Sequence, residues 1–102
     1  MLDELTSANF SPYLNQIFQL DLESGQTLAA ELIQVTDMGA ESMPHHPSHQ
    51  RRPFSIIFRC VSKLLLPQQI YRLRHAELGT LEIFLVPIGP DQTGLCYEAV
   101  FN

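Results

Sequence analysis

The chain has 102 residues and a formal net charge of −5, and 45% of its residues are hydrophobic whereas 17% are charged. A chain of this length builds one hydrophobic core but not two, so we expect a single domain over residues 1–102. No apolar run approaches the roughly 18 residues of a membrane-spanning helix, and the acidic start does not resemble a signal peptide. We therefore expect a cytoplasmic protein without a membrane partner.

The first predicted element is a short helix over residues 5–14. A hydroxyl side chain at Thr6 or Ser7 can cap its beginning, and Phe10 starts an apolar face with helical spacing. Asn15 can adopt the left-handed conformation that ends a helix. We expect this helix to plug one end of a sheet.

A β-hairpin follows the helix. Residues 17–22 predict a first strand, residues 23–26 (ESGQ) have the composition of a turn, and residues 27–36 predict a second strand. Apolar residues change face within the second strand, so we expect a β-bulge near Leu32.

Residues 37–53 predict a long exposed loop, because glycine and proline interrupt every regular pattern there. His45, His46 and His49 are clustered in it, and imidazoles bind zinc, copper or nickel. Pro47 prevents the helical turn that would bring His45 and His49 to one side, so we favour a solvated loop without a metal or other cofactor.

The rest of the chain predicts further strands separated by turns and loops. They span residues 54–60, 70–74, 80–87 and 95–101. The fold class is therefore all-β, a small antiparallel barrel or sandwich of about six strands with one short N-terminal helix.

The apolar pattern also predicts the strand pairing. Between the third-last and second-last strands, it pairs apolar residues with each other and opposite charges with each other, namely Leu73 with Leu81, Tyr71 with Ile83, Ile70 with Phe84, and Arg72 with Glu82. For the last hairpin, it predicts Leu85 opposite Tyr97, Ile83 opposite Ala99, Leu81 opposite Phe101, and Phe84 beside Glu98.

The outward side of these strands should be polar where it meets water, yet it includes several large apolar residues. Either the first hairpin folds over this row, or another chain covers it, whether identical or different. The candidate partner-binding residues are Ile57, Arg59, Ile70, Arg72, Phe84, Glu98 and Val100. The first hypothesis is therefore a non-enzymatic protein-interaction or assembly module.

All six lysines and arginines lie in the segment from Arg51 to Arg74, and such a basic segment can indicate a nucleic-acid-binding site. We favour internal ion pairs and no nucleic acid, because the parity of the strands points Phe58 and Tyr71 inward, away from any base. A second hypothesis is a barrel that binds a small ligand, an anion or a metal at its mouth. It would use the 37–53 loop with Arg51, Arg52 and Lys63.

Catalysis is not predicted. Cys60 and Cys96 are too few for a disulfide scaffold or a zinc site, and we expect two free thiols, of which Cys60 faces the core. His75 and Glu77 flank a tight connection, where polar residues usually serve the turn. No motif pairs a nucleophile with a base, so we expect a protein that is not an enzyme.

Several motifs of the second half are distinctive, and they are PFSIIFR, Leu66-Pro67-Gln68, Tyr71-Arg72-Leu73 with His75, VPIGPD over residues 86–91, and YEAVFN over residues 97–102. In these motifs the chain resembles an uncharacterised family of bacterial proteins of about this length, a domain of unknown function. It departs from that family in its His-rich loop and at Asn15, where glycine is more usual. The resemblance implies a non-enzymatic all-β module, offers no catalytic residue and suggests a link to phage-tail-like structures.

Overall fold

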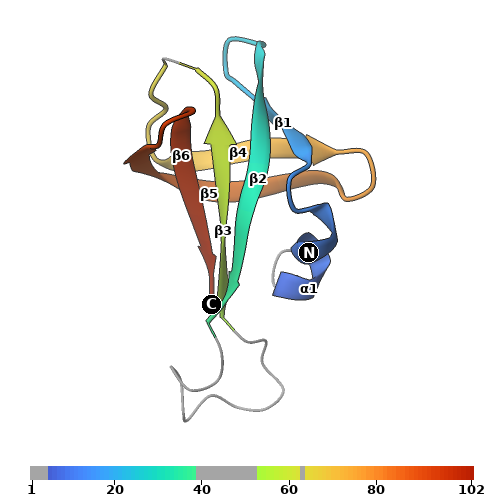
Figure 1. Ribbon diagram of the computed structural model, residues 1–102. Helices are drawn as coiled ribbons and strands as arrows, with labels where there is room; N and C mark the ends of the chain where they lie inside the picture. The colour runs from blue at the N-terminus through green and yellow to red at the C-terminus, as the bar shows by residue number, and fades with distance from the viewer. Residues whose placement is uncertain (1–4, 39–52, 63) are drawn as a thin grey trace.

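The computed structural model describes residues 5–38, 53–62 and 64–102. Six antiparallel strands close into a barrel in the order β1-β2-β3-β6-β5-β4 (Figure 1). The elements are α1 (Ser7–Phe10), the 3₁₀ turn η2 (Ser11–Tyr13), β1 (Ile17–Asp21), β2 (Thr27–Asp37), β3 (Phe54–Cys60), β4 (Gln69–His75), β5 (Gly79–Pro90) and β6 (Leu95–Phe101). The predicted fold class is confirmed, as a closed barrel rather than a sandwich. Across the described ranges, the structure contains no helix long and apolar enough to cross a membrane.

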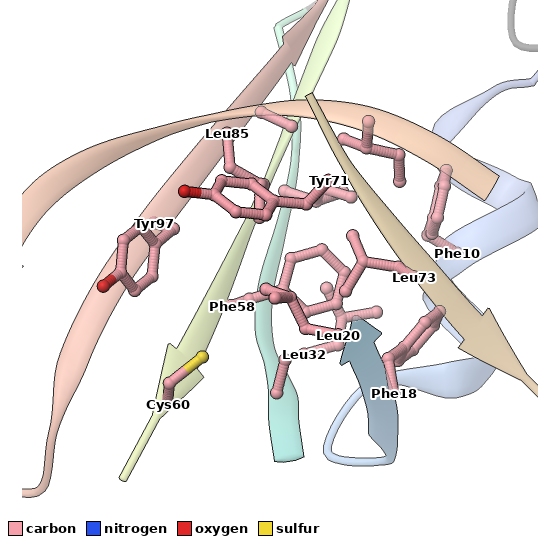
Figure 2. Packing of buried hydrophobic residues seen from close by; sticks show 14 of the residues in the cluster. Phe10, Phe18, Leu20, Leu32, Phe58, Cys60, Tyr71, Leu73, Leu85 and Tyr97 are labelled. Carbon is pink, nitrogen blue, oxygen red and sulfur yellow. The ribbon is translucent and has the colours of Figure 1, made fainter. Parts of the chain in front are cut away.

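The interior of the barrel is filled by side chains that alternate along every strand. Phe18, Leu20 and Leu32 of the first hairpin meet Phe58, Leu73 and Tyr97 from the other strands, and all of them are buried (Figure 2). Each large apolar side chain removed from water contributes roughly 1.5 to 3 kcal/mol. The first hairpin is thus part of the barrel wall, because its inward row completes the core.

The N-terminal helical segment closes one end of the barrel. The Phe10 ring is fully buried, and its centroid lies 5.9 Å from that of Phe54 and 5.8 Å from that of Phe101. The α-helix is shorter than predicted, since it ends at Phe10 and continues as a 3₁₀ turn that contains Pro12. Asn15 has the expected left-handed conformation, with φ of 71°. The predicted plug is confirmed.

The predicted bulge in β2 is also confirmed. Leu32 pairs with Phe58 and Gln34 pairs with Ile57, so Ile33 is the additional residue. The backbone N–H of Asn15 donates to the Leu32 carbonyl over 2.6 Å, which attaches the end of the helical segment to the strand at this irregular point. The bulge lets apolar residues of both parities in β2 contact the interior.

The β4–β5 register agrees with the prediction at all four pairs, including Arg72 opposite Glu82 and Ile70 opposite Phe84. The β5–β6 register was predicted wrongly by two residues, because Val86 rather than Phe84 lies opposite Glu98. β5 is longer than the sequence indicated, and it pairs with β6 only beyond the stretch that pairs with β4. Gly89, with φ of 112°, accommodates a second register shift there.

Candidate interaction surface

Large apolar side chains are exposed on the outside of β4, β5 and β6, besides Ile88 at the register shift of β5. Ile70 is 63% exposed, and Phe84 and Val100 are each 50% exposed. Their chain neighbours Tyr71 and Leu85 point into the core (Figure 2), so the pleat directs Ile70 and Phe84 outward. The parity predicted for these residues is correct.

The pairing of the strands brings these side chains onto one face. Ile70 lies directly opposite Phe84 across β4 and β5. Val86, two residues along β5, is paired with Glu98 of β6, and Val100 lies two residues beyond Glu98. Ile57 of β3 lies on the other side of Glu98 and is partly buried. We call the outward residues Ile70, Arg72, Glu82, Phe84, Val86, Glu98 and Val100 the outer face.

The first hairpin does not cover this face. β1 and β2 lie between β4 and β3 in the closed barrel and continue the wall instead of folding over its outside (Figure 1). The expectation that the N-terminal portion of the chain could shield Phe84 and Val100 is therefore wrong. The physical reason is that barrel closure uses both edges of the hairpin, one against β4 and one against β3.

The charges around the outer face differ in how firmly they are paired. Arg74 binds both carboxylate oxygens of Asp21, at 2.7 to 3.2 Å. Arg72 reaches Glu82 at only 3.9 Å, and both side chains are more than half exposed. Glu98 has no ion pair within the described residues. Arg72, Glu82 and Glu98 are thus the most weakly paired charges of this region.

Arg59 is not part of the outer face, and its ion pairs connect separate elements of the barrel. Its guanidinium donates to Asp91 over 2.8 Å and to Glu31 over 3.2 Å, so it connects β3 to the β5–β6 turn and to β2. Its Nε is buried without a hydrogen-bond partner in the described part of the chain. With Arg72 and Arg74, every basic residue that the structure describes is ion-paired within the chain, as the sequence analysis favoured.

Asp91 is the acceptor at the centre of that turn. Besides the Arg59 guanidinium, the backbone N–H groups of Thr93 and Gly94 donate to its Oδ1, each over 2.8 Å. The hydrogen bond from Arg59, followed by those from Gly94 and Thr93, holds the pKa of the Asp91 carboxyl well below its usual range. The ionised form is therefore the one that the fold stabilises.

Both cysteines are free thiols, as predicted. Cys60 faces the core (Figure 2), where burial first and the neighbouring Cys96 second raise its pKa to about 11. Cys96 points to the other side, and its pKa is also raised, mainly by burial and next by the Asp91 carboxylate. Nucleophilic chemistry needs a thiolate, so neither thiol is prepared for it.

His75 serves the turn before β5. Its Nδ1 accepts from the backbone N–H of Glu77 over 3.1 Å, so Nε2 carries the proton that is shared with Gln16 Oε1 at 2.8 Å. The rings of Tyr13 and Phe18 lie against the imidazole, each with a centroid distance of 4.7 Å. Nδ1 thus orders the turn itself, and Nε2 attaches the turn to the N-terminal segment.

The predicted ligand-binding loop lies largely outside the described residues. This applies to His45, His46 and His49, and equally to Arg51, Arg52 and Lys63. In the ranges that the structure describes, no three His, Cys, Asp or Glu side chains are grouped so that they could hold a metal ion. The second hypothesis from the sequence therefore stays a prediction.

A second group of exposed apolar residues lies between β3 and β4 and is not among the residues predicted from the sequence. Val61, Leu64 and Leu65, between β3 and β4, are 76%, 56% and 61% exposed. The segment that follows them is fixed by two tyrosines, since the Leu66 N–H donates to the Tyr97 hydroxyl and the Tyr71 hydroxyl donates to the Pro67 carbonyl. The sequence feature that could have revealed this group is the run of three leucines, residues 64–66, in a predicted loop. Near it, Val61 and Ser62 line an open depression with residues 90–95.

Comparison with known proteins gives a family but no activity. A family model matches residues 5–101, and it is described as a domain of unknown function (DUF6916). No curated protein and no solved structure matches the chain.

Proposed function

Since the chain belongs to a family of domains of unknown function (DUF6916), we propose its role from its own residues, as a non-enzymatic protein-interaction module that binds a partner through the outer face. The observation that carries this proposal is the exposure of Ile70, Phe84 and Val100 together on three successive strands. Single exposed apolar residues are ordinary, whereas several of them on neighbouring strands, with charged residues beside them, are typical of protein interfaces.

The barrel offers such a partner a rigid surface. Ile70, Phe84 and Val86 each neighbour a buried or partly buried core residue on the same strand, so the backbone that carries them is fixed by the core. Little conformational entropy is then lost when the face is covered, and more of the apolar contact energy remains as affinity. A bacterial origin, a cytoplasmic setting and the link to phage-tail-like structures stay predictions.

The test is the size of the protein in a fresh extract of its own cells, measured by gel filtration for the unaltered chain and two variants. Phe84→Lys places a charge in the centre of the outer face. Ile17→Lys makes the same kind of change on β1, at a side chain that is 49% exposed compared with 50% for Phe84. Ile17 is opposite Glu31, so a lysine there is well tolerated.

We expect the unaltered chain and Ile17→Lys to elute with a complex larger than one chain, and Phe84→Lys to elute as a single chain. Elution of the unaltered protein as a single chain would contradict the proposal. So would a complex that survives Phe84→Lys in a correctly folded protein.

A further inference from the structure

The outer face carries charged side chains on both sides of its apolar centre, with Arg72 and Glu82 on one side and Glu98 on the other. β5 is the middle strand, with β4 on one side and β6 on the other. Arg72 of β4 is level with Glu82, which precedes Phe84 by two residues, whereas Glu98 of β6 is level with Val86, which follows Phe84 by two residues. Arg72 and Glu98 therefore lie diagonally across Phe84.

This arrangement is self-complementary. A two-fold axis through Phe84, in the plane of the interface and perpendicular to the line from Arg72 to Glu98, exchanges the positions of the two charges. In a second copy related by that axis, Phe84 lies against Phe84 of the first copy, and Glu98 lies over Arg72 of the first copy. The same operation brings Ile70 of each copy towards Val86 of the other.

The pairing within one chain leaves both charges available for such a contact. Arg72 has one long contact with Glu82, and Asp21, which is opposite Arg72 on β1, is bound by Arg74. Glu98 is partly buried between Ile57 and Val86, without a cation among the described residues. A partly buried carboxylate beside apolar side chains is costly to leave unpaired, and a cation from a partner offsets that cost.

We infer that the partner of the outer face is a second copy of this chain, in a two-fold symmetric dimer centred on Phe84 with reciprocal Arg72–Glu98 ion pairs. This inference rests on the proposed interaction function and specifies its partner. A different protein would need its own matching diagonal of charges, whereas the second copy has it by symmetry.

The test is a charge exchange on the purified full-length chain, read by gel filtration with light scattering. Arg72→Glu faces Glu98 of the other copy, and Glu98→Arg faces Arg72, so each variant alone repels itself. We expect each to weaken self-association by about tenfold or more. In an equimolar mixture of the two variants, every contact across the axis joins opposite charges again, and we expect the mass of two chains.

Two further measurements complete the test. Glu77→Arg, with the same charge change as Glu98→Arg but on an exposed turn, should keep the mass of two chains. Native mass spectrometry of the mixture should find one copy of each variant per dimer, which also shows that both variants fold. A single-chain mass for the unaltered protein at high concentration, or a mixture that stays dissociated, would overturn the inference. If Phe84→Lys still abolishes the complex in extracts, the proposed function stands with a different partner.

Discussion

Asp91 shows how one exposed carboxylate organises the end of the barrel. It receives hydrogen bonds from Arg59 on β3 and from the two backbone N–H groups of its own turn. The sequence indicated a turn at this point from its glycine and proline residues. It could not show that Arg59 is bound there, because the two residues are far apart in the chain and meet only when β3 and β6 pair.

The depressed pKa of Asp91 predicts a dependence of stability on pH. The folded state favours the ionised carboxylate, so its contribution is present above the ordinary Asp pKa of about 3.9 and is lost as the pH falls below it. Asp91→Asn should unfold more easily near neutral pH, and it should lose less stability than the unaltered chain between about pH 6 and about pH 3. Urea denaturation at both pH values measures this. Equal acid sensitivity of the two proteins would contradict it.

The contribution of Cys60 to stability should depend on pH in the opposite direction. Its raised pKa means that folding favours the protonated thiol, so its contribution is present below the ordinary cysteine value of about 8.5 and is lost as the pH rises through about 11. In Cys96→Ala, which isolates this thiol, a disulfide reagent at about pH 8 should react only after urea has unfolded the protein. Rapid reaction of the native protein would show that Cys60 is accessible.

Gly94 is required for the close approach of the β5–β6 turn to β3. A Cβ added there would overlap the carbonyl oxygen of Cys60 and lie 3.0 Å from its carbonyl carbon. Because backbone cannot yield as a side-chain end can, Gly94→Ala should lower the free energy of unfolding by about 1 to 3 kcal/mol. Thr93→Ala in the same turn is the control, and urea denaturation should show the smaller loss for it. A similar effect of both variants would mean that the contact relaxes without cost.

The two registers of β5 show which strand pairings can be predicted from the sequence and which cannot. The β4–β5 register could be predicted because a slip of one residue turns every side chain to the wrong face. The β5–β6 register could not, since a slip of two residues leaves every side chain on its own face and changes only its neighbour. The stretch from Ile88 to Pro90 added to the error, because Gly89 and Pro90 predicted a loop where the strand continues through a bulge.

The contribution of the N-terminal plug to stability can be measured with a single substitution. Phe10 is fully buried against Phe54 and Phe101, so Phe10→Ala should lower the free energy of unfolding by about 3 to 5 kcal/mol. Leu14→Ala, in the same segment but 42% exposed, should cost about 0.5 kcal/mol or less. Equal losses in urea denaturation would show that the plug contributes little to the barrel.

At the scale of the whole molecule, closing the barrel determines which surface is left for a partner. All six strands contribute their inward rows to one core, so none of these strands covers the outward row. The alternation of residues predicted that row and its apolar members, Ile70, Phe84 and Val100. It could not decide between shielding by the chain itself and shielding by a partner, because that depends on closure between β1 and β4, which no local pattern encodes.

The most direct test of this account is photocrosslinking in living cells from a photoreactive phenylalanine at position 84, compared with the same probe at position 17. We expect one discrete protein adduct from position 84 and none from position 17. An adduct of twice the chain mass would identify the second copy. Absence of any adduct from position 84 in cells that produce the folded protein would contradict the claim that the outer face is covered by protein.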